Sequence, residues 1–398
     1  MPEYPLKRPT GCPFDPPAEF STLREQEPIS KVRLWDGKIA WLVTRYDDVR
    51  EVLSDPRFSS DMNAPGFPSH SAGVAATRQK HPTFLNMDDP EHAVHRRMLT
   101  RDFMIKRVEA LRPRIRDHVQ RLLDEFTARP RPADLVTGLA LPVTSSVISE
   151  LLGVPYEDHE FFQYQSGLLV SGETGPEEAL QAYEEMREYL RGLVERKAAE
   201  PAEDVISHLI EVERTGAIDR DQLLNMLRLL LGAGHETTAN MIALGTLALL
   251  ENPGQLAALR ADTSAPRVAN AVEELLRYLT ITHFGRRRVA TADVEVAGQL
   301  VRAGEPVVAA NDSANRDPDA FPGDPDRLDL GREARHHLTF GYGVHQCLGQ
   351  PLARVELQEV YPALFERLPG LRLAVPVEEL PFKTHMVFYG LFSMPVEW

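Results

Sequence analysis

One loop near the C-terminus constrains this chain more than any other feature. Residues 340–349 read Phe-Gly-Tyr-Gly-Val-His-Gln-Cys-Leu-Gly, which places the thiol of Cys347 in a glycine-punctuated loop. An apolar helical pattern begins directly afterwards at Leu348. Glycines let backbone N–H groups approach the sulfur, and the N-terminus of the following helix adds positive partial charge. Both effects favour a thiolate, which is the form of cysteine that binds a metal.

Other interpretations of this loop are weaker. A cysteine before a helix is often a small buried apolar residue, and Gly-x-Gly alone can form a tight turn or a phosphate loop. The dinucleotide and P-loop patterns are incomplete, because Gln346 stands where a third glycine would be and no Gly-Lys-Ser/Thr follows. The spacing F-G-x-G-x-H-x-C-x-G instead resembles the haem-thiolate loop of the cytochromes P450. The resemblance implies that Cys347 is the axial thiolate ligand of haem b. It also implies that Phe340, Gly341 and Gly349 belong to the cofactor site.

Composition sets the broad class of the chain. With 398 residues and no linker or charge block, we expect one large, mostly helical domain that encloses a cofactor. Cys12 and Cys347 offer no disulfide framework and fit a reducing compartment. No secretory signal is visible, and the most apolar run, residues 241–250, is too short to span a bilayer. We therefore expect a cytoplasmic protein without membrane contact, and the net charge of −15 argues against nucleic acid as a partner.

The apolar pattern predicts a mainly α fold with small antiparallel β-sheets. Residues 32–44 alternate around Asp36-Gly37, which is a hairpin signal. Residues 59–84 lack periodicity, so we expect a long surface loop, and loops of this length are often functional lids. Helical patterns dominate from 90 to 279, with breaks near 129–130, 172–175 and 261–266, and strands are expected at 294–296, 300–301 and 307–308. The single domain, residues 1–398, would comprise a β-rich part at about 30–60, a helical body at about 90–280, and strands with the cysteine loop at about 281–398.

Residues 219–252 should form one long helix of roughly 50 Å that crosses the interior. Asn252-Pro253 supplies its end. Its middle, residues 232–238, reads Gly-Ala-Gly-His-Glu-Thr-Thr and breaks the apolar pattern. Glycines lower helix stability, and a buried glutamate needs a partner or a function. A conflict of this kind within a core helix points to a site.

This segment resembles the oxygen-binding segment of the cytochromes P450. The resemblance implies that Ala233 makes room beside the haem, while Glu236 and Thr237 are the acid and the alcohol of a proton relay. Such a relay is needed because cleavage of the O–O bond of bound oxygen consumes two protons. A zinc-protease motif is excluded, because Ala239 stands where H-E-x-x-H requires histidine. The alternative is structural: Thr237 bonds back to a helix carbonyl and Glu236 caps a loop.

Glu274 and Arg277 lie three residues apart, on one face of a predicted helix. In the family such a pair is structural and is joined by an arginine from a later loop. Residues 325–328, Pro-Asp-Arg-Leu, match that loop, so the resemblance implies that Arg327 is the third member, although Leu328 replaces the usual phenylalanine. We assign all three to scaffold stability around the cysteine loop rather than to catalysis.

The resemblance also implies cationic and donor groups for the haem propionates. His92 and Arg96 are four residues apart, so they share one helix face and can reach one carboxylate. Arg288, His337 and His345 complete the set. Taken singly, each is explained as well by an ordinary surface residue. Together they occur in the order that the family shows.

The resemblance covers essentially the whole chain and is closest to soluble bacterial cytochromes P450 of actinomycete type. It implies a monomeric monooxygenase that uses O2 and electrons from a ferredoxin and ferredoxin reductase. The substrate would be a lipophilic small molecule, a secondary metabolite or xenobiotic, which is hydroxylated or epoxidised. A basic strip that suits an acidic ferredoxin comprises Arg96, Arg97, Arg101, Lys106, Arg107 and Arg112. Pocket candidates are residues 59–84 and 169–172, Leu230, Ala233, Ile281, Phe284 and Val387, with His283 or Arg287 for a polar end of the substrate.

Two other functions stay open. Fungal nitric oxide reductases resemble the N-terminal half, including residues 82–92, and take electrons directly from NAD(P)H. They lack the acid before the threonine, so Glu236 favours oxygen activation. A haem-based sensor without turnover is the second alternative. Sensors usually carry an output module, and no spare domain is visible.

Overall fold

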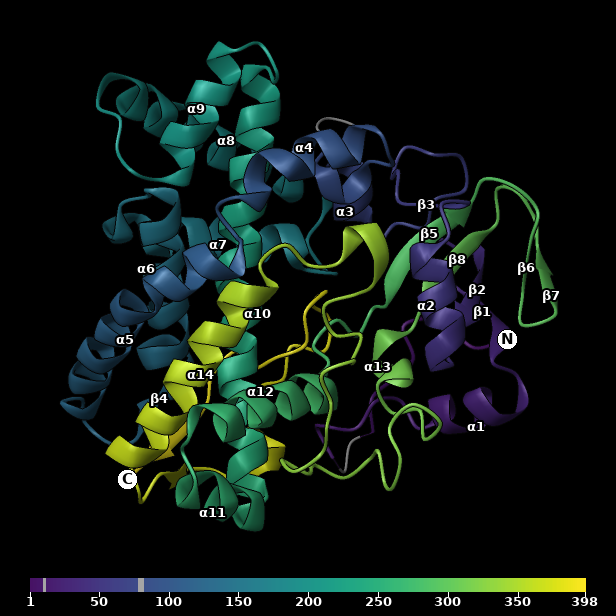
Figure 1. Cartoon of the computed structure of the whole chain (residues 1–398). Helices are drawn as coiled ribbons and strands as arrows, with labels where there is room; N and C mark the ends of the chain where they lie inside the picture. Colours follow the sequence, from purple (N-terminus) through teal and green to yellow (C-terminus); the bar gives the residue numbers. More distant parts are fainter. Residues whose placement is uncertain (10–11, 78–81) are drawn as a thin grey trace. The chain divides into compact units, whose positions relative to one another are not determined.

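The computed structural model describes residues 1–9, 12–77 and 82–398, and it is mainly α-helical with small sheets, as expected (Figure 1). The chain forms two compact units that interleave in sequence. The first unit comprises residues 1–71, 244–347 and 387–389, and the second comprises 72–243, 348–386 and 390–398. The division into three successive parts of one domain stays a prediction.

The first unit is built on a five-stranded sheet with the order β1-β2-β8-β5-β3. The strands are β1 Ile29–Arg33, β2 Ile39–Val43, β3 Phe58–Ser59, β5 Arg286–Ala290 and β8 Pro306–Ala309. The predicted hairpin is confirmed, because β1 and β2 pair antiparallel across a turn in which Gly37 has φ 81°. The expectation of purely antiparallel sheets is wrong here: β2 pairs parallel with β8. These strands are far apart in sequence, so no tight turn forces the antiparallel direction.

Both faces of this sheet are covered, which follows from the alternation of side chains along β8. Val307 and Ala309 pack with the buried face of helix α2 (Tyr46–Ser54). Val308 points the other way and packs with Phe20 of helix α1 (Glu19–Gln26). Because successive side chains alternate between faces, a strand covered on both sides is apolar throughout. The remaining elements of this unit are α11 Pro253–Ala261, α12 Ala265–Leu279, β6 Val294–Val296, β7 Gln299–Val301, α13 Asn311–Ala314 and the short η4 Gly343–His345.

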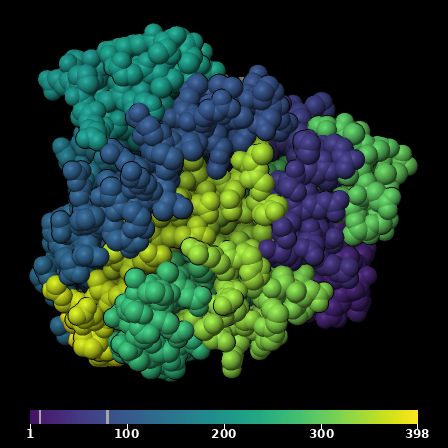
Figure 2. Space-filling model, viewed as in Figure 1, coloured from purple at the N-terminus to yellow at the C-terminus, as the bar shows by residue number. Residues whose placement is uncertain are grey.

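The second unit is largely helical. Its helices are α3 Ala72–Thr77, α4 Glu91–Thr100, α5 Ile105–Thr127, α6 Leu141–Leu152, α7 His159–Val170, α8 Pro176–Ala199, α9 Val205–Arg214 and α14 Gln350–Arg367. Its shorter helical turns are η1 Phe84–Asn86, η2 Val136–Ala140, η3 Tyr156–Asp158 and η5 Val377–Glu379. A small antiparallel sheet has the order β4-β10-β9, with β4 Ala133–Asp134, β10 Pro395–Glu397 and β9 Arg372–Leu373. Figure 2 shows α5 in blue directly beside α14 in yellow, although more than two hundred residues separate them.

Several predicted boundaries are confirmed. Helices end or begin at each of the three expected breaks, and β6, β7 and β8 contain the three expected strands. The expectation of one long loop over residues 59–84 is wrong for the part that the structure describes. This stretch contains α3 and buries Phe67 and Ser69, because its apolar and small residues pack into the units although they lack a regular period. Residues 78–81 of that stretch lie outside the described residues.

The predicted long helix is confirmed as α10, Arg220–Glu251, with 32 residues. It ends directly before Asn252-Pro253, and it passes from the second unit into the first at Leu244. His235 and Glu236 are buried in its middle, as the broken apolar pattern indicated. Among the helices that the structure describes, none combines the length and apolar character required to cross a membrane.

Candidate functional site

The cysteine loop is closed by its own backbone. The N–H of Cys347 donates to the carbonyl oxygen of Phe340 at 2.8 Å. Gly341 and Gly343 both have positive φ, 75° and 73°, a region that other residues rarely adopt. A Cβ atom on Gly343 would also lie 2.6 Å from the carbonyl oxygen of Leu53 in α2. The glycines are therefore required by the turn and by close packing, and α14 begins three residues after the cysteine.

Arg286 places positive charge beside this loop. It lies on β5, and its Nη2 donates to the carbonyl oxygen of Thr339 at 3.4 Å. Burial lowers the pKa of Arg286, while the charge of Cys347 raises it, so the two groups act on one another. Its Nε atom is buried and has no hydrogen-bond partner among the described residues. A buried, unsatisfied cationic donor near a thiolate loop fits a site that receives an anionic group, such as a haem propionate.

Sequence reasoning selected Arg288 and missed Arg286. Residues two apart on a strand share a face, so the signal was present in the run Arg286-Arg287-Arg288. Arg288 is buried, and its Nη1 donates to the carbonyl oxygen of Arg287 at 2.8 Å. Arg287 instead donates to Nδ1 of His70 at 2.9 Å and to the carbonyl oxygen of Ser69 at 3.0 Å. Its guanidinium is thus engaged by protein groups, which does not support a role in fixing a substrate.

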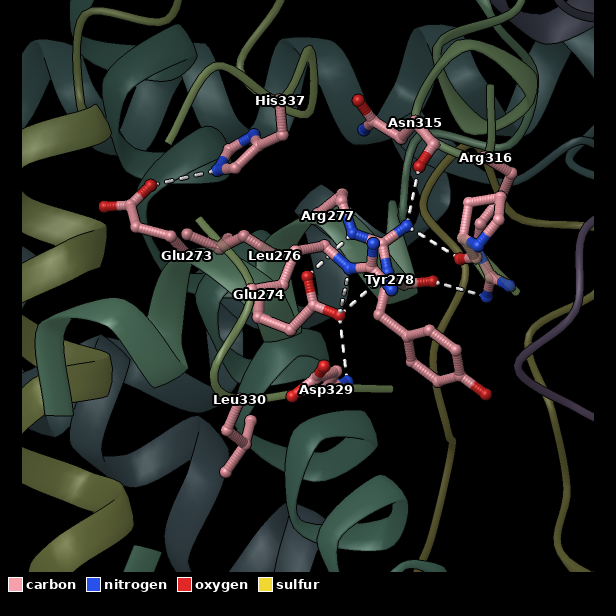
Figure 3. A network of polar contacts seen from close by, with 12 residues as sticks. Glu273, Glu274, Leu276, Arg277, Tyr278, Asn315, Arg316, Asp329, Leu330 and His337 are labelled. Atoms are coloured by element: carbon pink, nitrogen blue, oxygen red, sulfur yellow. Dashed lines mark hydrogen bonds and ion pairs between the residues drawn. The ribbon is translucent and has the colours of Figure 1, made fainter. Parts of the chain in front are cut away.

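The Glu274–Arg277 pair is fully buried in the first unit (Figure 3). Nε and Nη2 of Arg277 donate to the two carboxylate oxygens of Glu274 at 2.7 and 2.8 Å. The remaining Nη1 donates to the carbonyl oxygens of Asn315 and Pro325 at 2.7 and 2.8 Å. This geometry joins α12 to two later loops, because a bidentate pair with satisfied donors is strong and directional. The structural role that the sequence predicted for this pair agrees with its contacts.

The prediction that Arg327 joins this pair is wrong. Its side chain is 70% exposed, and its nearest carboxylate is that of Asp329 at 4.0 Å. Arg332 takes the place instead, with Nε 3.3 Å from Oε1 of Glu274. Its other nitrogens donate to the carbonyl oxygens of Pro322 and Asp324. The backbone after Arg327 stays close to the pair, because Leu328 and Leu330 are buried and the N–H of Asp329 donates to Glu274 at 3.0 Å. The side chain of Arg327 itself points into solvent, so local motif spacing selected the wrong arginine.

The histidine candidates differ in their surroundings. His337 is buried; its Nε2 lies 3.1 Å from Glu273, and its Nδ1 accepts the N–H of Thr339 at 3.2 Å. Protein groups engage both ring nitrogens here, and the contact of His337 with a propionate stays a prediction. His345 lies within η4, two residues before the cysteine, and is half-buried. In the second unit, His92 is buried on α4 with Nδ1 3.0 Å from Asp89, and Arg96 lies one turn further on, half-buried.

The middle of α10 carries a buried ion pair within the second unit. Nζ of Lys383 lies 2.6 Å from Oε1 of Glu236 and 3.0 Å from Oδ1 of Asn240. Burial raises the pKa of Glu236, but Lys383, with smaller contributions from His235 and Asn240, more than offsets this effect, so the pKa lies below its usual value. Sequence reasoning recognised that a buried glutamate needs a partner, but it missed Lys383, which lies 147 residues later.

The helix around Ala233 remains regular. Oγ1 of Thr237 donates to the carbonyl oxygen of Ala233 at 2.8 Å, which is the back-bonded arrangement of the structural alternative. Glu236 does not cap a loop, because it pairs with Lys383. Gly234 allows close packing, since a Cβ there would overlap the side chain of Ile148. Thr237 must therefore release a backbone carbonyl before its hydroxyl can take part in a relay.

The pocket candidates fall in both units. On α10 of the second unit, Leu230 is buried and Ala233 is exposed. In the first unit, Ile281 and Phe284 are buried and Val387 is half-buried. The carbonyl oxygen of Ile281 accepts the N–H of Tyr389 at 2.8 Å, and the ring of Tyr389 lies 5.4 Å from that of His283.

The basic strip is partly neutralised. Arg112 donates to Glu109 and Glu359, Arg107 donates to Glu203, and Arg101 lies 3.7 Å from Asp102. Arg97 and Lys106 remain exposed on α4 and α5.

Comparison with known proteins agrees with this geometry. Residues 15–169 and 176–368 match the model of the Cytochrome P450 family. Cytochrome P450-SU2 of Streptomyces griseolus is 53% identical over 394 residues, which cover 99% of this chain and 96% of the relative. Pentalenic acid synthase of Streptomyces avermitilis is 49% identical, covering 97% of this chain and 95% of the relative. The solved structure of mycinamicin VIII C21 methyl hydroxylase from Micromonospora griseorubida aligns with a TM-score of 0.94 at 39% identity, over 100% of both chains.

The chain belongs to the cytochrome P450 family. It is a monooxygenase of the bacterial type, and membership implies haem with a cysteine thiolate as axial ligand. The closed loop at Cys347 and the unsatisfied Arg286 donor both fit that cofactor.

Proposed function

We propose that this protein inserts an oxygen atom from O2 into a lipophilic natural product, with electrons supplied by a ferredoxin and ferredoxin reductase. The closed loop at Cys347, with Arg286 beside it, is the observation that carries the proposal. The names of two relatives, a pentalenic acid synthase and a mycinamicin hydroxylase, support a natural product as substrate. The apolar pocket candidates Leu230, Ile281 and Phe284 agree with a lipophilic molecule.

In this proposal Cys347 would hold the haem, and Arg286, Arg288, His337 and His345 of the same unit would receive its propionates. His92 and Arg96 of the second unit keep the propionate role that the family resemblance implies. The thiolate-bound haem supplies the activation of O2 and the transfer of one oxygen atom to carbon. The protein supplies the conditions for it. The glycine turns close the loop that carries the sulfur, and the guanidinium of Arg286 stabilises negative charge in a partly buried place.

Glu236 and Thr237 form the proposed proton relay. Glu236 is ionised near neutral pH, because its pKa lies below the usual value. It therefore first takes up a proton and then passes it on to the hydroxyl of Thr237. Thr237 supplies its hydroxyl once it leaves the carbonyl oxygen of Ala233. Before a proton can pass along this relay, the ion pair of Lys383 with Glu236 and the hydrogen bond of Thr237 with Ala233 must both open.

We place the ferredoxin contact on the exposed cations of α4 and α5, Arg97 and Lys106, rather than on the whole basic strip. Arg107 and Arg112 already pair with carboxylates of this chain. An acidic partner would be attracted by the cations that remain, and this attraction weakens with salt.

Reconstitution with NADPH, ferredoxin, ferredoxin reductase and 18O2, against a panel of macrolides and terpenoids, tests the proposal. The expected result is one 18O atom in a product, formed only when ferredoxin is present. Consumption of NADH and nitric oxide without ferredoxin would instead establish the reductase alternative. Haem binding without any turnover over the panel and without NADPH consumption would favour the sensor.

A further inference from the structure

Glu236 belongs to a buried polar cluster that ties the middle of α10 to the C-terminal segment. The cluster consists of Glu236, Asn240 and Lys383, which are 7%, 2% and 6% exposed. Lys383 reaches both α10 side chains, at 2.6 and 3.0 Å, and Nδ2 of Asn240 donates to Oε1 of Glu236 at 3.3 Å. All three residues lie in the second unit. Oε1 of Glu236 therefore accepts two hydrogen bonds within the protein.

The ionisation of Glu236 in this cluster depends on Lys383. Burial raises the pKa of Glu236, and the ammonium of Lys383 is the largest opposing influence, with smaller help from His235 and Asn240. His235 is buried, and its Nδ1 lies 2.7 Å from the carbonyl oxygen of Leu231, within its own helix. Removal of the ammonium would leave a buried carboxylate without a counter-charge, and such a group takes up a proton instead.

Lys383 lies on a hairpin that presses against α10. Phe382 and Leu391 form an antiparallel bridge, and the N–H of Lys383 donates to the carbonyl oxygen of Gly390 at 2.9 Å. A Cβ atom on Gly390 would overlap the amide of Asn240. The hairpin therefore approaches the helix as closely as a glycine permits, and a shift of its strands moves the ammonium.

The same hairpin is bonded to the segment that follows α7. Ser171 and Met386 form an antiparallel bridge, and the N–H of Gly172 donates to the carbonyl oxygen of His385 at 2.8 Å. Nε2 of His385 also lies 3.7 Å from Glu173. Residues 171 and 172 belong to a segment that the sequence marked as a pocket candidate. Two steps of backbone pairing thus connect this segment to the counter-ion of Glu236.

We propose that Lys383 is a positioning residue of the proton relay. It keeps the Glu236 carboxylate in the ion pair until a ligand displaces residues 171–173 and, with them, the hairpin. The inference rests on the proposed role of Glu236. It adds a second requirement for proton delivery, namely a movement of the C-terminal hairpin, and so links delivery to occupancy of the pocket.

The influence of the Lys383 ammonium on the ionisation of Glu236 is tested by infrared spectroscopy of holoenzyme labelled with 13C-glutamate. In Lys383→Met, a protonated-carboxyl band should be present at neutral pH, and it should disappear in the double variant Lys383→Met/Glu236→Gln. Lys383→Arg should show no such band. Lys197→Met is the matched control, because it breaks a different ion pair of the second unit, in which Nζ of Lys197 lies 2.5 Å from Asp204. Absence of the band from folded Lys383→Met would show that Lys383 does not keep Glu236 ionised.

The proposed coupling between Lys383 and the segment after α7 is tested by hydrogen exchange in the ligand-free holoenzyme. Lys383→Met should speed exchange in peptides that cover residues 169–175 by about tenfold, while Lys197→Met should not. If Lys383→Met fails to fold, the double variant with Glu236→Gln, which removes both charges, replaces it. Faster exchange confined to residues 380–392 would refute the link.

A last comparison uses 4-phenylimidazole as a pocket ligand. Binding of this probe to wild-type holoenzyme should speed exchange at residues 169–175 and at 380–392 together. Exchange that is unchanged or slowed at both segments would overturn the displacement step. Neither infrared nor exchange data depend on turnover. If Glu236→Gln leaves the ratio of product to free hydrogen peroxide unchanged, the relay itself fails, and these measurements still decide what Lys383 does.

Discussion

Arg332, and not Arg327, contacts the buried Glu274–Arg277 pair, and this difference can be tested with matched variants. Arg332→Gln removes a guanidinium that is 11% exposed and contacts Glu274 at 3.3 Å and two backbone carbonyls at 2.6 and 2.7 Å. Hydrogen bonds that involve a charged group contribute about 1.5–3 kcal/mol each, but they are not additive. Glu274 keeps Arg277 and the N–H of Asp329, so we expect a loss of about 2–4 kcal/mol.

This loss corresponds to a measurable shift in melting temperature. At about 2.1 cal/mol/K per residue, unfolding of a chain of this length has an entropy of roughly 0.8 kcal/mol/K, so the melting temperature should fall by about 2–5 °C. Arg327→Gln changes a side chain that is 70% exposed, and the free energy of unfolding should change by less than about 0.5 kcal/mol. Circular dichroism melts of both holoproteins provide the comparison. Equal shifts for the two variants, or a larger one for Arg327→Gln, would refute the assignment of Arg332.

Three further variants test other parts of the structure. Gly343→Ala should lower the free energy of unfolding by about 1–3 kcal/mol because of its positive φ and the nearby carbonyl, whereas Gly254→Ala, which meets open space, should not; urea titrations that show equal losses would contradict this. Arg286→Met removes a cation that favours the thiolate of Cys347, so the thiol-ligated carbon monoxide complex should form at a higher pH than in the wild type; an unchanged pH titration of the Soret band would exclude this influence. Arg97→Glu should slow electron transfer from ferredoxin at low salt and reduce the salt dependence of its rate, as stopped-flow reduction would show. A wild-type rate that is indifferent to ionic strength would remove α4 from the docking surface.

The sequence predicted the features that depend on local pattern. The hairpin around Gly37, the long helix α10 and the strands β6 to β8 follow from periodicities of two and 3.6 and from glycine and proline signals. The cysteine loop was readable for the same reason, because its glycines occupy positions where φ is positive. The buried Glu274–Arg277 pair lies within one helical turn and was found by its spacing.

Features that depend on distant contacts were not readable. The parallel pairing of β2 with β8, the Lys383 partner of Glu236 and the Arg332 partner of Glu274 all join segments widely separated in sequence. Local rules state that a buried charge needs a partner, but many lysines and arginines satisfy that requirement equally well. Only the fold selects one. Arg286 illustrates the same limit in part: it shares a face of β5 with Arg288, but only the fold brings it to the carbonyl oxygen of Thr339 beside the cysteine loop.

Whether Cys347 is the thiolate ligand of a haem can be read from the carbon monoxide difference spectrum of the dithionite-reduced protein. We expect a Soret band at the red-shifted position typical of thiolate ligation, and loss of that band in Cys347→His. A band at the position typical of histidine or thiol ligation, in freshly prepared and folded wild-type protein, would show that Cys347 is not a thiolate ligand.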